Sequence, residues 1–268
     1  MNEGGSGTSV GTNTENSAQN QIIDNEHQMY LRSQQHLQEI EDEVRQTQPL
    51  DSPEYFKKAN ELAGSYSHIR KIRGDGNCFY RAVLTAQLER CFQDKAELAR
   101  LTTLCKGWRQ KLFDFGFPEL TTDGRAIGVT SANGSKAHEN GLQMLFDDLN
   151  VDGIANYYVA FLRLICSGYL RENEVIFSGF IEGGRTLDQF CKDEIEPMWK
   201  ECDHICIIAL VNAIQVPIRI EYMDQTQAPN GGWHHDFTPD FVAEGSDAPK
   251  LFFLYRPGHY DILYPETS

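Results

Sequence analysis

Three short segments near the carboxyl end of the chain have the composition of β-strands, whereas the long segments before them have the periodicity of helices. The strand-like segments, at 216–222, 251–255 and 259–264, are rich in β-branched and aromatic residues. A turn sequence containing Pro257 and Gly258 separates the last two, so we expect them to pair as an antiparallel hairpin. Helices followed by a few late strands predict an α+β fold, mostly helical with a small late sheet.

Apolar residues recur every three or four positions in several earlier segments, which predicts helices. These segments are 56–66, 79–88, 96–115 and 154–165. A thinner apolar stripe predicts an amphipathic helix at 26–48, where Pro49 stops the pattern. This helix either lies on the domain or is an arm that docks on a partner protein.

The chain is expected to divide into a tail, an arm and one domain. Residues 1–25 are rich in Gly, Ser, Thr and Asn, with few large apolar side chains, and we expect a disordered tail. The helical arm spans 26–50, and the folded domain spans 51–268. Within this domain, the polar and glycine-rich segment 121–141 predicts a loop of about 20 residues, longer than the usual connection.

The charge balance restricts the classes of partner. The chain has 24 Lys and Arg against 39 Asp and Glu, a net charge of −15. Nucleic acids and anionic membranes attract basic proteins, so we expect neither, and a basic protein partner fits better. Seven irregularly spaced cysteines do not suggest a disulfide framework and favour a reducing compartment. With no secretory signal or membrane span expected, we predict a cytoplasmic location, with the nucleus as an additional one. We also expect a monomer.

A glycine-punctuated loop brings a cysteine to the start of a predicted helix. Residues 73–78 read R-G-D-G-N-C. Gly74 and Gly76 permit backbone angles that other residues avoid, so successive main-chain N–H groups up to Asn77 can converge on one oxyanion. The positive end of a helix dipole favours a thiolate over a thiol. Cys78 therefore has the position of a nucleophile, although a buried core cysteine is the alternative.

A second candidate group lies on the last predicted strand. Because strand side chains alternate, His259 and Asp261 face one side and Tyr260 the other. A carboxylate there can accept the imidazole Nδ1 proton and leave Nε2 facing a thiol as a general base. The alternative is a surface pair on an edge strand. An early thiol and a late His-x-Asp fit the rule that nucleophile and base are distant in sequence but adjacent in the fold.

Two sequence blocks carry a family resemblance. GDGNCFYRA at 74–82 and YRPGHYDILY at 255–264 resemble the signature blocks of the otubains, ovarian-tumour-type (OTU) cysteine proteases that cleave ubiquitin from ubiquitin chains. Further similar segments lie at 65–73, 156–170, 180–200, 203–210 and 219–224, so the resemblance spans about 65–265. It implies a papain-like OTU cysteine-protease fold.

The resemblance also implies roles for individual residues. Cys78 would be the nucleophile, His259 the base, Asp261 its orienting acid, and Asp75 would help shape an oxyanion loop of Gly74, Gly76 and Asn77. The reaction would be thioester-forming attack on the isopeptide carbonyl between a ubiquitin C-terminus and a lysine amine, followed by hydrolysis. The preferred chain linkage would be the one that marks substrates for degradation. No cofactor is implied.

Family likeness further implies a surface for the distal ubiquitin around 176–182, 193–200, 208–220 and the loop near Trp233. The candidate contacts are Ile176, Phe177, Phe180, Ile181, Glu196, Pro197, Met198, Trp199, Trp233 and His234. Family members use an amino-terminal helix for the proximal ubiquitin, which 26–48 would match. They have an aromatic-rich helix where this chain has 121–141, and its loss could cost several kcal/mol.

Two alternatives remain. The protein could be a non-catalytic binder that sequesters ubiquitin or ubiquitin-conjugating enzymes, with the thiol incidental. Cys202, His204 and Cys206, with His234 and His235, could also be imagined around zinc. Their spacing differs from that of a common zinc finger, and interleaved isoleucines indicate buried core, so we expect no metal.

Overall fold

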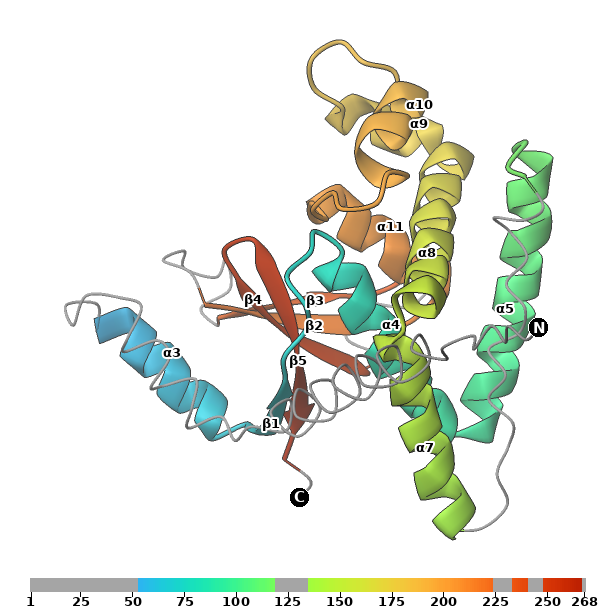
Figure 1. The fold of residues 1–268 in the computed structure, drawn as a ribbon. Coiled ribbons are helices and arrows are strands. Elements are labelled where there is room, and N and C mark those ends of the chain that lie inside the picture. The colour runs from blue at the N-terminus through green and yellow to red at the C-terminus, as the bar shows by residue number, and fades with distance from the viewer. Residues whose placement is uncertain (1–52, 119–134, 224–232, 241–247, 267–268) are drawn as a thin grey trace, which may run out of the picture.

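The computed structural model describes residues 53–118, 135–223, 233–240 and 248–266 (Figure 1). The predicted tail at 1–25 and the arm at 26–50 lie outside the described residues. Within the described residues, no helix is both long and apolar enough to cross a membrane.

A five-stranded mixed sheet has the order β1-β5-β4-β2-β3. Its strands are β1 (Tyr66–Arg70), β2 (Ile218–Tyr222), β3 (His234–Phe237), β4 (Leu251–Arg256) and β5 (His259–Pro265). β2 and β4 run parallel and the other neighbours run antiparallel. The predicted hairpin of the last two strands is confirmed, with Arg256 opposite His259 and Leu254 opposite Asp261. The small, late sheet of the α+β prediction is thus present.

Two strands were not predicted. The helix expected to reach residue 66 ends earlier, as α3 (Pro53–Ala63), and Tyr66 begins β1. β1 pairs with β5, which is almost 200 residues away in sequence, so its short local pattern was a weak signal. β3 reads HHDF and lacks strand composition. It is held at the sheet edge by pairing with β2, where Arg219 Nε donates to Asp236 Oδ1 at 2.7 Å.

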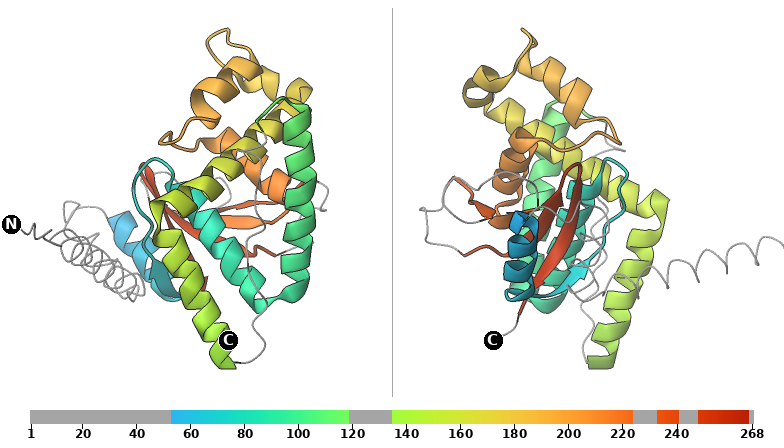
Figure 2. Two further views of the ribbon diagram at one scale, coloured as in Figure 1. Left: turned by 45° about the vertical axis from the view of Figure 1, so that its right-hand side comes forward. Right: turned by 90° about the vertical axis from the view of Figure 1, so that its left-hand side faces the viewer.

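Helices flank the sheet on both faces (Figures 1 and 2). They comprise α4 (Cys78–Gln93), α5 (Lys95–Asp114), α7 (Ser135–Asn150), α8 (Asp152–Glu172), α9 (Glu174–Phe177), α10 (Leu187–Phe190) and α11 (His204–Ile214), with short turns η1 (Ser178–Phe180) and η2 (Cys191–Ile195). The main core joins α4, α8 and α11 to one sheet face, whereas α3 covers the other face through a smaller cluster.

Helix α4 is buried on nearly all sides, which explains why it lacks an amphipathic pattern. Phe79, its second residue, packs edge-on against Phe253 of β4 and Tyr260 of β5, with ring centroids 6.1 and 5.1 Å apart. These contacts fix the first turn of α4 beside the β4–β5 hairpin. Residues near 79 and residues near 260, which are far apart in the sequence, therefore lie side by side in the fold.

The prediction of a loop over 121–141 is wrong for its last part, because α7 begins at Ser135. Residues 119–134 lie outside the described residues. The polar stretch at 135–141 contains no proline, and it leads directly into apolar residues of the same helix, such as the buried Phe146. Polar residues are common in the first turn of a helix, so a polar stretch does not by itself exclude one.

Candidate active site

Cys78 is the first residue of α4, and its side chain is buried. Gly76, two residues earlier, has φ +73°, a conformation that favours glycine. A Cβ at this position would lie 2.4 Å from the main-chain oxygen of Trp199, so the loop backbone packs directly on another segment. The glycine is therefore required twice, by its angle and by this close approach.

His259 and Asp261 lie on the same side of β5, as strand alternation predicts. His259 Nε2 donates to Asp261 Oδ1 at 3.0 Å. Asp261 is fully buried, and the same oxygen accepts the Ile72 amide at 2.8 Å while Oδ2 accepts from Arg256. Since Ile72 precedes the cysteine loop, this carboxylate connects the hairpin to the segment that carries Cys78.

The ring nitrogens differ from the predicted assignment. We expected Nδ1 to bond to Asp261 and Nε2 to face the thiol, but Nε2 is the nitrogen bonded to Asp261. Cys78 is close enough to the ring of His259 to raise its pKa, and Nδ1 is the nitrogen that remains to face the thiol. The prediction was wrong because spacing in a strand fixes which side chains share a face but not which way a ring is turned.

Hydrogen bonds and nearby charges favour the charged forms of His259 and Asp261. Hydrogen bonds from His259 to Asp261 and to Cys78 raise the pKa of His259 to about 9. Burial acts to raise the pKa of Asp261, but the bond from His259 and the charge of Arg256 outweigh it, and the net shift is downward. An imidazolium beside a carboxylate is therefore the stable state near neutral pH.

Asp75 is engaged within its own loop. Its Oδ2 accepts from Arg81 Nη2 at 2.7 Å, and its Oδ1 accepts the Asn77 amide at 3.0 Å. Burial acts to raise the pKa of Asp75, but the Arg81 hydrogen bonds and the Asn77 amide lower it overall. Asp75 thus shapes the loop through Arg81 and Asn77.

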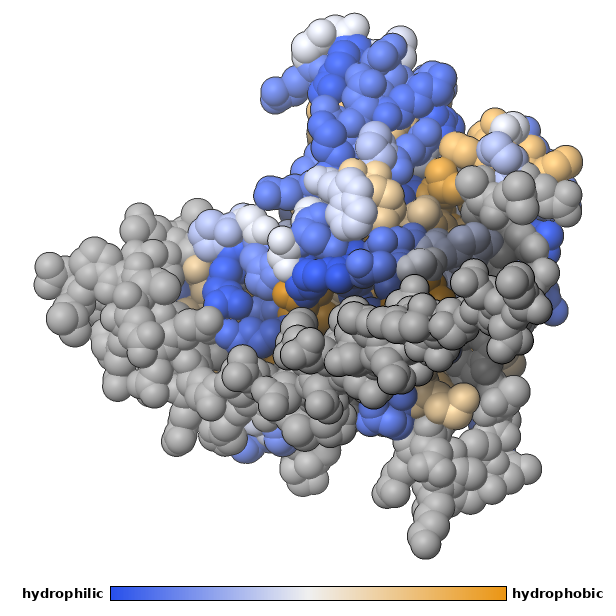
Figure 3. Space-filling model, viewed as in Figure 1, coloured by the Kyte–Doolittle hydropathy of each residue, from blue (hydrophilic) through white to orange (hydrophobic). Residues whose placement is uncertain are grey.

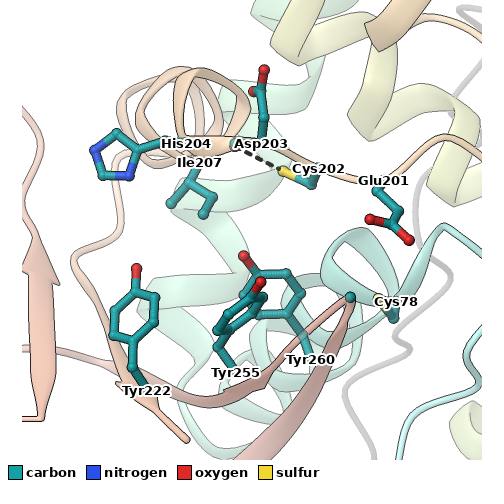
Figure 4. Close-up of a pocket in the computed structure, with 10 residues that line it drawn as sticks. Cys78, Glu201, Cys202, Asp203, His204, Ile207, Tyr222, Tyr255 and Tyr260 are labelled. Carbon is teal, nitrogen blue, oxygen red and sulfur yellow. Dashed lines mark hydrogen bonds between the residues drawn. The ribbon is translucent and has the colours of Figure 1, made fainter. Parts of the chain in front are cut away.

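A pocket of about 300 Å³ opens beside Cys78 (Figure 4). Glu201, Cys202 and Asp203 line one side of it, and three tyrosines line the other, namely Tyr222, Tyr255 and Tyr260. Asp203 also caps α11 by accepting the Cys206 amide at 2.9 Å, and burial raises its pKa to about 7. The Glu201 carboxylate lies on one wall of the pocket and the tyrosines form the other, which suits an extended basic peptide better than an acidic one.

Sequence reasoning missed Arg163 of α8, which is fully buried. Its guanidinium donates to Asn77 Oδ1 and to the Gly76 carbonyl, each within 3.0 Å. The sequence carries a weak signal for it, a lone arginine within the apolar pattern of 154–170.

The predicted ubiquitin contacts from α9 to residue 200 differ in exposure. Ile176, Phe180 and Trp199 are exposed, whereas Ile181, Pro197 and Met198 are half-buried. Phe177 is buried and packs against Tyr169, with ring centroids 6.2 Å apart. The prediction that it contacts ubiquitin is therefore corrected, because Phe177 supports this surface instead of forming it. Glu196 is bound by Arg171 at 2.7 Å. In Figure 3 the visible face of the top of the molecule, where Figure 1 places α9 and α10, is mostly hydrophilic.

Trp233 and His234 line a different pocket, of about 220 Å³, between α3 and β2. Lys58 lies over the Trp233 ring at 4.3 Å, and His234 Nδ1 is 3.9 Å from the buried Glu221. Their pocket has Tyr222 in common with the pocket at Cys78. The predicted contacts therefore fall into two groups in the structure.

The segment considered for zinc surrounds the start of α11. Among the residues that the structure describes, no group of three or more His, Cys, Asp or Glu could hold a metal ion. His204 and His235 pack instead against the Phe237 ring, with centroids 5.1 and 4.4 Å away. All seven cysteines are free.

Comparison with known proteins identifies a family. The family model Peptidase C65 Otubain matches residues 24–265. A "ubiquitin thioesterase otubain-like" protein of Caenorhabditis briggsae is 46% identical over 221 residues, which cover 81% of this chain and 76% of the relative. The human "ubiquitin thioesterase OTUB1" is 42% identical over 210 residues, covering 78% of this chain and 75% of the relative.

Solved structures agree with the sequence matches. A ceOTUB1 chain in complex with ubiquitin aldehyde and UBC13~Ub aligns with a TM-score of 0.73 at 37% identity, covering 87% of this chain and 92% of that one. An h/ceOTUB1 chain with ubiquitin aldehyde and UBCH5B~Ub aligns with a TM-score of 0.74 at 34% identity, covering 95% and 99%. The fold is therefore the OTU cysteine-protease fold that the sequence blocks implied.

Proposed function

The chain belongs to the peptidase C65 otubain family, and from this premise we propose that it is a thiol-dependent deubiquitinase that hydrolyses isopeptide bonds in polyubiquitin. The observation that most supports this is the meeting of Cys78, His259 and Asp261, which come from opposite ends of the sequence. Relatives named ubiquitin thioesterases supply the substrate class.

The reacting form is the ion pair of a Cys78 thiolate and a protonated His259, which arises when the thiol gives its proton to the neutral ring. Because the pKa of His259 is raised to about 9, the ring holds that proton near neutral pH. The thiolate attacks the isopeptide carbonyl, and the carbonyl oxygen becomes an oxyanion. As that intermediate collapses, His259 protonates the leaving lysine amine and a thioester forms. Water then attacks the thioester with His259 as base, which releases ubiquitin and restores the thiol.

Asp261 and the loop amides assist this sequence without bonding covalently to substrate. Asp261 keeps Nε2 occupied, so Nδ1 is presented to the thiol. The Cys78 amide stands at the first position of α4, where it has no acceptor within the helix, and can donate to the oxyanion. The wall that carries Glu201 would receive a basic, extended ubiquitin tail.

A ubiquitin probe with a thiol-reactive C-terminal group tests the nucleophile. We expect covalent labelling of the wild-type protein and none of Cys78→Ala. The variant should still bind ubiquitin, because binding uses surfaces beyond the thiol. Labelling that persists in Cys78→Ala would assign the chemistry to another cysteine.

The linkage preference is a finer part of the proposal. We infer from the family likeness that the linkage marking substrates for proteasomal degradation is cleaved fastest. A panel of linkage-defined diubiquitins, cleaved by purified protein, measures this preference directly. Equal rates across the panel would contradict it.

Binding of ubiquitin-conjugating enzymes is a second candidate function. It is favoured by the complexes of solved relatives with UBC13~Ub and UBCH5B~Ub. Such binding would not require the thiol, so Cys78→Ala should bind a ubiquitin-charged conjugating enzyme as well as the wild-type protein does. Calorimetry with both proteins tests this, and absence of binding by both would remove the function.

We also propose a cytoplasmic location extending to the nucleus. The seven free cysteines support a reducing compartment. Fractionation of cells expressing the tagged full chain would test it, and recovery from the secretory fraction would contradict it.

A further inference from the structure

Arg163 is an unusual residue for the interior of this protein. It lies in the middle of α8 and its side chain is fully buried. Buried arginines are usually paired with a carboxylate. In the part of the chain that the structure describes, no carboxylate lies within ion-pair distance of Arg163, and its hydrogen bonds go to uncharged oxygens.

Those oxygens belong to two segments that meet next to Cys78. From the cysteine loop, Asn77 Oδ1 accepts from Nε at 3.0 Å and from Nη2 at 2.7 Å, and the Gly76 carbonyl accepts from Nη2 at 3.0 Å. From the end of η2 and the segment that follows it, the carbonyl of Ile195 accepts at 3.0 Å and that of Lys200 also accepts. The guanidinium lies 4.4 Å from the centre of the Tyr80 ring.

These bonds fix the peptide unit between Gly76 and Asn77 at both of its polar atoms. The carbonyl of that unit is bound by Arg163, and its N–H donates to Asp75 Oδ1 at 3.0 Å. The side chain of Asn77 is bound as well, by Arg163 and by the Trp199 amide at 3.1 Å. With the peptide unit before Asn77 and the Asn77 side chain both restrained, the direction of the next amide, that of Cys78, is restrained too.

Burying a guanidinium here costs desolvation free energy, and a well-packed apolar side chain often stabilises an interior more than a buried charge does. Its fork of donors offers what an apolar side chain lacks, a fixed geometry for several acceptors at once. Direction of the loop backbone is what oxyanion binding depends on. The arrangement therefore serves orientation better than it serves stability.

We propose that Arg163 is a positioning residue that holds the peptide units preceding Cys78 in the orientation that binds the oxyanion. It acts through Gly76 and Asn77 and not on the thiol. The inference rests on the proposed function, because an oxyanion forms only if an acyl group is transferred. It goes beyond that function because it predicts which step slows when the hydrogen bonds from Arg163 to Gly76 and Asn77, here called the clamp, are lost.

The test compares two reactions of the same thiol. Hydrolysis of ubiquitin carrying a C-terminal fluorogenic amide passes through an oxyanion. Alkylation by iodoacetamide does not: the Cys78 sulfur bonds to a saturated carbon and iodide leaves. For Arg163→Lys and Arg163→Met we expect kcat for hydrolysis to fall by about 100-fold, with KM and the alkylation rate at Cys78 within about threefold of wild type. Alkylation is quantified on the Cys78 peptide by mass spectrometry.

Arg171 provides a matched control on the same helix. Two turns after Arg163, it holds the segment after η2 through Glu196 at 2.7 Å, and its hydrogen-bond partners Ser167, Glu196 and Asp188 lie outside the cysteine loop. We expect Arg171→Met to leave kcat within about threefold of wild type. Asn77→Ala cuts the clamp from the loop side while Arg163 keeps its carbonyl partners, and should lower kcat about tenfold with alkylation unchanged.

Thermal melts accompany each variant, since Arg163→Met leaves buried acceptors without a donor. If neither Arg163 variant folds, Asn77→Ala decides. Retained kcat in the folded variants, alkylation that falls in parallel with hydrolysis, or an equal loss in Arg171→Met would overturn the positioning role. A wild-type protein that does not hydrolyse the ubiquitin substrate would overturn the proposed function itself, and this role with it.

Discussion

The two halves of the site are built in different ways. The hairpin half is local: Arg256, His259 and Asp261 lie within six residues, and strand alternation alone puts the histidine beside the carboxylate. The nucleophile half is not local, because Asn77 is bound by Arg163, 86 residues away, and by Trp199, 122 residues away. A short sequence pattern therefore predicts which side chains meet where the backbone is a regular strand. The geometry of an irregular loop depends instead on contacts with residues far away in the sequence.

Exchanging one glycine in each half tests this contrast and should give the largest effect. Gly76 and Gly258 both have positive φ, +73° and +76°. A Cβ at Gly76 would meet the Trp199 main-chain oxygen at 2.4 Å, whereas one at Gly258 would meet only the end of the Glu201 side chain, at 3.5 Å. We expect Gly76→Ala to lower the free energy of unfolding by about 2–5 kcal/mol and kcat by at least about 100-fold, as the loop must move.

Gly258→Ala is the matched control. It should cost about 1–2 kcal/mol, the penalty of the backbone angle alone, with kcat reduced only a few fold. Urea unfolding and hydrolysis of the fluorogenic ubiquitin substrate measure both quantities. Equal losses in the two variants would show that the contact with Trp199 is not what distinguishes the halves.

The same contrast explains how much of the fold was predictable. The β4–β5 hairpin was predicted because Pro257 and Gly258 mark a turn between two strand-like runs. β3 was missed, because HHDF becomes a strand only through its pairing with β2. The length of α3 was overestimated, since Tyr66 continues the helical spacing but its hydroxyl donates to Glu221 Oε1 of β2 at 2.6 Å. Long-range pairing overrode local periodicity in both cases.

The candidate site shows the same division. Cys78, His259 and Asp261 were named from local patterns and the structure brings them together, although their catalytic roles stay predictions. The orientation of the His259 ring was predicted wrongly. Arg163 was missed because its importance lies in the acceptors around it, which come from two other segments of the chain.

In the hairpin half, Asp261→Asn should have the next largest effect. The amide keeps an acceptor for the Ile72 N–H but cannot stabilise an imidazolium as a carboxylate does. We expect kcat to fall by about 10- to 100-fold, and the pKa that governs the basic limb of the pH profile to move below the value of about 9 found for His259.

The measurement is the pH dependence of kcat/KM between pH 6 and pH 10 for both proteins, with Asp188→Asn, an exposed carboxylate far along the chain, as control. A basic limb that stays in place would remove Asp261 as the cause of the raised pKa. A lower kcat with an unmoved basic limb would instead indicate that the substitution displaces the His259 ring without changing its pKa.

The pH dependence of stability gives a smaller effect. The pKa of His259 is raised from 6.5 to about 9 by folding, so its charged form stabilises the protein fully below pH 6.5, and this contribution is lost as the pH rises through 9. We therefore expect the difference in Tm between wild type and His259→Gln to be largest near pH 6 and to shrink by pH 10. Calorimetry at a series of pH values measures it, and a constant difference would contradict the raised pKa.

Asp75→Asn should have the smallest effect, and it tests the part of the nucleophile half that is as local as the hairpin. Asp75 pairs with Arg81, six residues later, and its carboxylate is occupied by that arginine and by the Asn77 amide. The substituted amide can still accept from Asn77, so we expect kcat to fall only about threefold and the free energy of unfolding by about 1–2 kcal/mol, the loss of a charge-assisted bond. Arg81→Lys, which keeps the charge but not the fork, should show a similar small loss. If Asp75→Asn instead lowered kcat 100-fold at unchanged stability, the carboxylate would have to act on the oxyanion site directly, and the local part of the loop would govern catalysis as strongly as the distant clamp.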